Sequence, residues 1–309
     1  MAVIVEDLIK DFNLEVINEG KENIHITIND INRPGLQFSG FYSYFANERV
    51  QLIGKAEWSF LDVMPEELRN KRLKKFFQFE TPCIIMTRGL EPHKELLENA
   101  SKYGRWVLRS EDISTRFINK LTNYLDEKLA PETRLHGVLV DVHGIGILIT
   151  GESGIGKSET ALELIKRGHR LVADDAVDIK EIEGKLLGRS PYVTSGMMEV
   201  RGMGIIDVPA LYGLSSVLDV KTIGLVIHLE QWVQDKTYDR LGIDGETMQI
   251  LNASIRKITL PIRPGRNIAI IIETAAVNYR YSLNSDITPV DTITTRMDEE
   301  ELRRRKYGE

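Results

Sequence analysis

A glycine-rich run in the second half of this 309-residue chain constrains its fold more than any other feature. The run fits the pattern G-x-x-x-x-G-K-[ST] and reads Gly151, Glu152, Ser153, Gly154, Ile155, Gly156, Lys157 and Ser158. An apolar, strand-like stretch precedes it at residues 147–150, and a helix-like stretch follows at residues 158–167. We therefore predict a phosphate-binding loop, or P-loop, between a strand and a helix.

The chemistry of phosphate binding explains these residue types. Glycines let the backbone turn so that several N–H groups face phosphate oxygens, and the helix N-terminus adds partial positive charge. In such loops the lysine reaches the terminal phosphates and the hydroxyl binds Mg²⁺. All eight residues of the run are thus predicted nucleotide ligands, with Lys157 and Ser158 in these special roles.

The chain is long enough for two domains, and Pro131 interrupts the helical pattern near residue 130. We predict an N-terminal α/β domain of unclear role at residues 1–130 and a catalytic domain with a C-terminal helix at residues 131–309. In the first domain the patterns predict helices at residues 5–12, 65–77, 92–103 and 111–128, and strands at residues 24–28, 50–53, 83–86 and 106–108. The strand–helix–strand order of residues 83–108 predicts a parallel sheet.

The second domain is rich in strand patterns. We predict strands at residues 137–140, 144–149, 171–173, 176–179, 204–208, 223–229 and 267–272. Helices are predicted at residues 157–167 and 275–284 and in the charged tail from residue 298.

Charged residues near the predicted loop are candidates for the rest of the site. Asp174 and Asp175 follow a strand that returns from the loop helix, so one of them is a candidate base. Glu199 or Asp207 could hold a metal ion. Candidate phosphate clamps are Arg240 and the two arginines of the rigid turn at residues 261–266.

Five motifs occur in the order His136-Gly137, residues 151–158, 168–175, 198–206 and 261–266. Together they closely resemble the bifunctional HPr kinase/phosphorylase family of Gram-positive bacteria. The resemblance implies phosphorylation of a serine of HPr with ATP or pyrophosphate, Mg²⁺ dependence, and phosphorolysis of phosphoserine-HPr to pyrophosphate. It also implies a homo-hexamer, a kinase domain similar to phosphoenolpyruvate carboxykinase, and a role in carbon catabolite repression and sugar uptake.

The same resemblance implies roles for single residues. Asp175 would handle the proton, Ser158 and Glu199 would hold the metal, and His136, Lys157 and Arg240 would be further active-site residues. The segment implied for both directions is Glu199, Val200, Arg201, Gly202, Met203, Gly204, Ile205, Ile206 and Asp207. The segment implied mainly for dephosphorylation is Pro261, Ile262, Arg263, Pro264, Gly265 and Arg266.

Composition and net charge argue against nucleic-acid-binding and membrane-spanning proteins. A net charge of −6 argues against bulk nucleic-acid binding, and no apolar stretch reaches the ~18 residues that span a bilayer, so we expect a cytoplasmic protein. Cys83, the single cysteine, is predicted to fill the core. A small-molecule kinase of the carboxykinase type and a nucleotide-dependent switch remain alternatives. Two acids close behind the loop favour a kinase, because a switch positions water instead.

Overall fold

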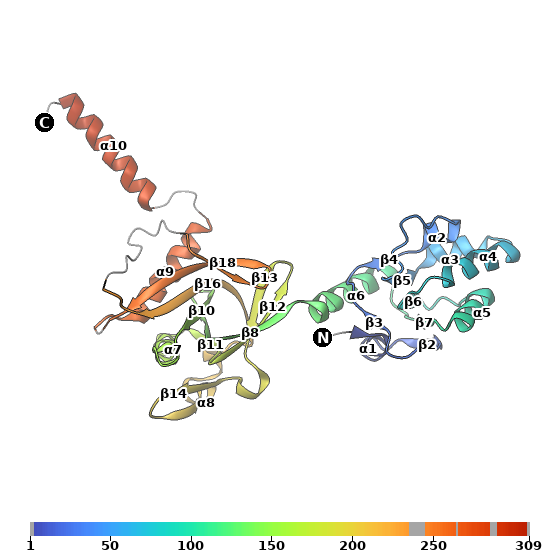
Figure 1. Ribbon diagram of the computed structural model, residues 1–309, viewed down its shortest axis with the longest axis horizontal. Helices are drawn as coiled ribbons and strands as arrows, with labels where there is room; N and C mark the ends of the chain where they lie inside the picture. Colours follow the sequence, from blue (N-terminus) through green and yellow to red (C-terminus); the bar gives the residue numbers. More distant parts are fainter. Residues whose placement is uncertain (1–2, 235–244, 264, 285–288, 308–309) are drawn as a thin grey trace. The chain divides into compact units, whose positions relative to one another are not determined.

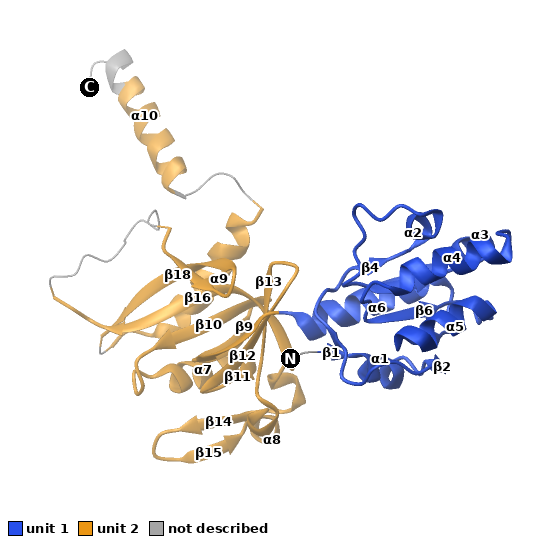
Figure 2. Cartoon of the chain, turned by 45° about the vertical axis from the view of Figure 1, so that its right-hand side comes forward, with its two compact units in different colours: residues 1–130 blue, residues 131–309 orange. Residues whose placement is uncertain are grey.

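A computed structural model describes residues 3–234, 245–263, 265–284 and 289–307 (Figure 1). The chain forms two compact units, Met1–Ala130 and Pro131–Glu309 (Figure 2). Each unit has its own sheets, helices and buried core, so each is described separately. Within the described residues no helix is both long enough and apolar enough to span a membrane.

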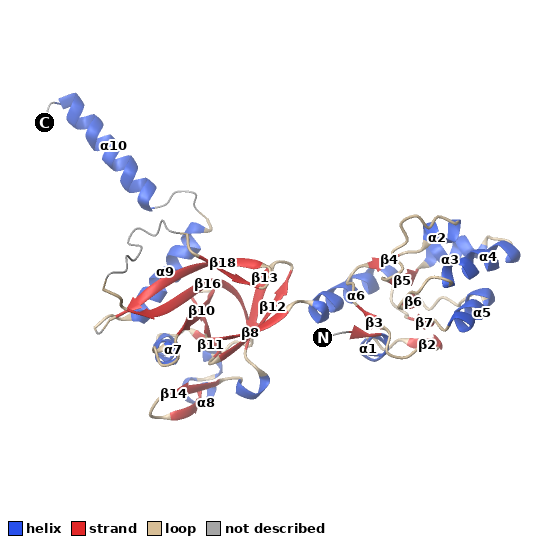
Figure 3. Ribbon diagram, viewed as in Figure 1, coloured by secondary structure: helices blue, strands red, loops and turns tan. Residues whose placement is uncertain are grey.

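The first unit is a small α/β domain (Figure 3). Its strands are β1 (Val3–Ile4), β2 (Glu15–Asn18), β3 (His25–Ile26), β4 (Ile31–Asn32), β5 (Val50–Ile53), β6 (Cys83–Met86) and β7 (Trp106–Arg109). Its helices are α1 (Val5–Asp11), α2 (Gly35–Ser39), α3 (Lys55–Asp62), α4 (Glu66–Phe77), α5 (Lys94–Tyr103) and α6 (Ser114–Leu129). The main sheet has the order β2-β7-β6-β5-β4 and is parallel except for β2.

Apolar side chains cover both faces of this sheet. Along β6, Cys83 and Ile85 belong to one core with residues of α1 and α6, whereas Ile84 and Met86 belong to another with residues of α2 to α5. Strands buried on both faces carry continuous apolar runs rather than alternating ones. This explains the sequence of β6 and confirms that Cys83 is a buried core residue.

The second unit is built on a larger mixed sheet. Its strands are β8 (Glu132–His136), β9 (Val138–Val142), β10 (Ile145–Gly151), β11 (Arg170–Ala173), β12 (Ala176–Ile182), β13 (Lys185–Arg189), β14 (Met197–Val200), β15 (Gly204–Asp207), β16 (Val220–Gln231), β17 (Thr247–Ile250) and β18 (Ala253–Ile262). Its helices are α7 (Lys157–Lys166), α8 (Val208–Tyr212), α9 (Ile268–Ser282) and α10 (Pro289–Tyr307).

Strand β16 organises this sheet. It pairs in parallel with β10 on one side and with β18 on the other, and its first residues also pair antiparallel with β13. The path of the sheet runs β11-β9-β10-β16-β13-β12-β8. Helices α7 and α9 contribute buried apolar residues to the core on one face of β9, β10 and β16. The carboxyl ends of β10, β16 and β18 therefore lie at one edge, the usual place for ligands in α/β sheets.

Most predicted elements are confirmed, including the parallel strands β6 and β7. The strand predicted at residues 267–272 is wrong, because this segment begins α9. The Asn267 side chain accepts the Ile270 N–H at 3.1 Å and caps the helix. The strand that pairs with β16 on the side away from β10 is β18, which the apolar pattern did not indicate.

Candidate functional site

The glycine-rich loop joins β10 directly to α7. Gly154 and Gly156 have φ of 84° and 101°, conformations that other residues adopt at a cost. Lys157 is buried at the start of α7, and its Nζ donates to the carbonyls of Gly151 and Glu152 at 2.9 Å each. The predicted strand–loop–helix context is thus present, with the lysine ammonium folded over the loop.

Asp174 links the helix after this loop to a hairpin that is distant in the sequence. Its Oδ1 accepts the Ser158 hydroxyl at 2.8 Å, and its Oδ2 accepts the Glu199 backbone N–H at 2.9 Å. Burial raises the pKa of Asp174 above its ordinary value, and the negative charge of Asp175 adds to this, although the two hydrogen bonds oppose it. The buried carboxyl thus ties the loop helix to β14.

Asp175 occupies the next position but faces a different partner. It lies in the turn between β11 and β12 with φ of 65°, and its side chain is 70% exposed. The His136 Nδ1 lies 3.1 Å from its Oδ1. Because β8 and β12 pair with Ala176 opposite His136, the sheet itself brings the two side chains together. This exposed carboxylate is accessible to a bound molecule, whereas both oxygens of buried Asp174 already accept hydrogen bonds.

The segment from Glu199 to Asp207 forms the β14–β15 hairpin, in which Glu199 lies opposite Ile205. Of the two candidate metal ligands, Asp207 caps α8 by accepting the Ala210 N–H at 2.8 Å, whereas Glu199 contacts Asp174 through its backbone N–H. Arg201 reaches the glycine loop: a β-carbon built on Gly154 would be 2.5 Å from its Nη1. The hairpin therefore supplies a guanidinium beside the loop.

A hollow of about 630 Å³ opens beside the tip of the loop. It is lined by Gly154, Ile155, Gln231, Trp232, Ile262 and Arg263. The Arg263 guanidinium lies over the Trp232 ring, with its central carbon 3.1 Å from the ring centre. The structure thus brings the 261–266 segment to the loop. Gln231 and Trp232 were not predicted from the sequence, and their only signal was their position at the end of a long apolar strand, where Gln231 is the last residue of β16 and Trp232 follows it.

Other predicted residues are less well defined. The Arg266 Nη1 donates to the Pro261 carbonyl at 3.3 Å, which closes the turn at residues 261–266 on itself. Arg240 and Pro264 lie outside the described residues. The described site therefore rests on the loop, the two aspartates, His136, the hairpin and Arg263.

The fold and this site define a two-domain mixed α/β protein whose second domain carries a glycine-rich strand–loop–helix junction. Two family profiles match the chain: "HPr Serine kinase N terminus" covers residues 3–125, and "HPr Serine kinase C-terminal domain" covers residues 127–297. The chain belongs to the HPr serine kinase family.

Curated relatives match nearly the full length. A protein of Clostridium tetani named HPr kinase/phosphorylase is 76% identical over 98% of this chain and 99% of its own length. One of Clostridium acetobutylicum with the same name is 70% identical over 97% of this chain and 98% of its own. Among solved structures, the Hpr(Ser) kinase/phosphatase from Coxiella burnetii is 38% identical, covering 49% of this chain and 93% of that one, with a TM-score of 0.46.

Proposed function

We propose that this chain phosphorylates a serine of the phosphocarrier protein HPr and removes the same phosphate by phosphorolysis. The relatives' names support both activities. The observation that carries the proposal is the pair Asp174 and Asp175: one residue binds the loop helix through Ser158, while its neighbour presents an exposed carboxylate beside His136. Protein kinases and ATPases likewise set a proton-handling or nucleophile-orienting group beside a phosphate-binding element.

In the kinase direction the loop binds the phosphates of the donor. Lys157 exchanges the carbonyls of Gly151 and Glu152 for phosphate oxygens and balances charge on the phosphoryl group in transfer. Asp175 accepts the proton of the HPr serine hydroxyl. His136, at 3.1 Å, holds the carboxylate in position.

In the reverse direction inorganic phosphate attacks phosphoserine along the same path. By microscopic reversibility Asp175 then returns a proton to the serine oxygen as it leaves. Pyrophosphate is the product, so the loop needs to hold only phosphates and not a base. Arg201 and Arg263, which lie against the loop and its hollow, supply positive charge for the incoming phosphate.

The residues present fit Mg²⁺. The Ser158 hydroxyl and the Asp174 carboxylate are hard oxygen donors joined at 2.8 Å, and Glu199 follows on the adjoining hairpin. Ser158 and Glu199 are the ligands that we propose, with Asp174 orienting the hydroxyl. When bound, the ion would neutralise charge on the phosphates.

The proposal includes several points that rest on the family resemblance. These are ATP or pyrophosphate as donor, a P-loop domain similar to phosphoenolpyruvate carboxykinase, a homo-hexamer in the cytoplasm, and control of carbon catabolite repression and sugar uptake. Arg240 and Pro264 belong to the proposed site through the same resemblance.

The test is transfer of labelled phosphate from ATP, and separately from pyrophosphate, to purified HPr. Adding inorganic phosphate should then release the label as pyrophosphate. HPr with its target serine changed to alanine is the matched control and should stay unlabelled. Phosphorylation of small molecules without HPr would favour a carboxykinase-like enzyme, and slow hydrolysis with no acceptor would favour a switch.

A further inference from the structure

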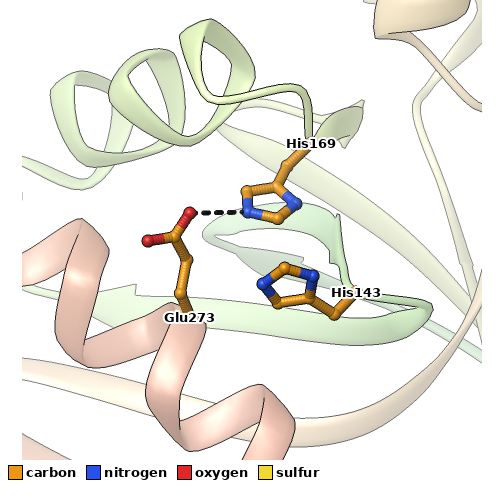
Figure 4. Close-up of side chains that lie close together, drawn as sticks. All are labelled: His143, His169 and Glu273. Carbon is orange, nitrogen blue, oxygen red and sulfur yellow. Dashed lines mark hydrogen bonds and ion pairs between the residues drawn. The ribbon is translucent and has the colours of Figure 1, made fainter.

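A group of side chains that could ligate a metal ion lies away from the glycine loop. It consists of His143, His169 and Glu273 (Figure 4). One potential ligand atom from each residue lies within 4.8 Å of the others. The proposed phosphotransfer uses none of the three.

Three separate elements bring these residues together. His143 forms the turn between β9 and β10 with φ of 50°, His169 follows α7 and Gly168, and Glu273 lies in the second turn of α9. The turn is at the beginning of β10, whereas the glycine loop is at its end. A strand of this length spans roughly 20 Å, so the cluster is remote from any phosphate on the loop.

The donor set selects the kind of ion. Two imidazoles and one carboxylate are a common set for Zn²⁺, whereas Mg²⁺ prefers oxygen ligands alone. Tetrahedral zinc with bonds of about 2.0–2.1 Å places its ligand atoms roughly 3.3 Å apart. The His169 Nε2 and the Glu273 Oε1 are already 3.0 Å apart, and His143 is exposed and able to turn toward them.

The surroundings support these ligands. His169 is 7% exposed and packs edge-on against the His143 ring, with ring centres 4.7 Å apart. Arg167 binds the other oxygen of Glu273 at 3.3 Å, which leaves Oε1 for an ion, and it also pairs with Glu163 at 2.9 Å. With two carboxylates to one guanidinium, this network keeps negative charge beside the two histidines.

We propose that His143, His169 and Glu273 form a structural site for Zn²⁺ or a similar transition-metal ion. The ion takes the place of the hydrogen between His169 and Glu273 and adds His143 as a third protein ligand, with water as the fourth. Bound there, it fastens α9 to the β9–β10 turn and to the connection between α7 and β11.

The test uses the untagged full chain, freed of metal with a chelator and then given Zn²⁺ or Co²⁺. After gel filtration we expect one zinc ion per chain by elemental analysis, visible absorption bands of tetrahedral Co²⁺, and a higher unfolding temperature with zinc than with chelator. A wild-type chain that retains no zinc and shows no such bands would overturn the proposal.

Three variants separate this site from adventitious binding. His143→Asn should preserve the turn, because asparagine tolerates left-handed backbone conformations, yet weaken zinc binding at least about tenfold. Glu273→Gln should also lose the ion, whereas His25→Ala, at an exposed histidine of the first unit, should keep it. Equal zinc retention by His143→Asn and the wild type would refute the site. In chelator, His143→Asn should unfold at the wild-type temperature.

Discussion

Replacing Asp175 by asparagine tests the proposed chemistry most directly. The backbone at this residue is left-handed, with φ of 65°, and asparagine adopts that conformation more readily than most residues. The side chain is 70% exposed, and an amide can keep the contact with His136. The substitution therefore removes the ability to accept a proton while leaving the turn intact.

The expected magnitude follows from these facts. A positioned general base contributes about 10²- to 10⁴-fold, or roughly 3–5 kcal/mol of barrier at about 1.4 kcal/mol per tenfold. Because no buried group is lost, the stability should change by no more than about 0.5 kcal/mol. Asp175→Ala would add a left-handed backbone cost of roughly 1–2 kcal/mol, so the asparagine variant is the cleaner one.

The assay measures initial rates of serine phosphorylation of HPr and of its reversal by phosphate, together with thermal unfolding. Asp178→Asn is the matched control, because it makes the same change three residues along and removes only the exposed contact with Arg134. Asp175→Asn should lower both rates and leave the unfolding temperature unchanged. A near-normal kinase rate in a folded Asp175→Asn chain would refute the role given to this carboxylate.

Three other substitutions test separate parts of the site and fold. Arg266→Ala should reduce dephosphorylation more than phosphorylation, and equal losses in the two rate assays would contradict the segment's role. Burial raises the pKa of Asp174, so its charged form costs stability as pH rises through that pKa. The unfolding temperature of Asp174→Asn should therefore exceed that of the wild type by more at pH 7 than at pH ~4. Asn267→Ala removes the α9 cap and should lower the free energy of unfolding by about 1 kcal/mol in urea titrations; an unchanged midpoint would count against the cap.

The sequence predicted those parts of the fold in which local pattern and burial agree. Strands β5 and β6 are short and mainly apolar, they are buried on both faces, and their predicted bounds match the structure. The error at residues 267–272 has a local cause, since an apolar run alone does not separate a strand from a buried helix, and the Asn267 cap decides it. Strand β18 was missed because most of its side chains are only half-buried and several are charged or polar.

The sequence predicted many of the residues that form the site but not the contacts between them. The glycine run and the two aspartates could be identified from their spacing. Spacing alone left open which of Asp174 and Asp175 is the candidate base, and only the family resemblance singled out Asp175. The contacts of Asp174 with Ser158 and Glu199 could not be predicted, because these residues come together only in the folded chain. Trp232 belongs to no predicted motif, and only the structure shows that it lines the hollow and that Arg263 stacks on it.

The pairing of β10 with β16 also bears on how the chain is made. Gly146 pairs with Ile223 and Gly151 with Leu229, so the strand that carries the glycine loop has a parallel neighbour encoded far downstream. When β10 leaves the ribosome, β9 is the neighbouring strand that has already been synthesised and can pair with it. Residues 152–219 must follow before β16 can pair with β10. Parallel pairing between such distant segments is slow, because the intervening chain must first bring its two ends together. The glycine loop can therefore reach its final position only after β16 has been synthesised and has paired with β10. A chain whose synthesis stops before residue 220 should not bind phosphate.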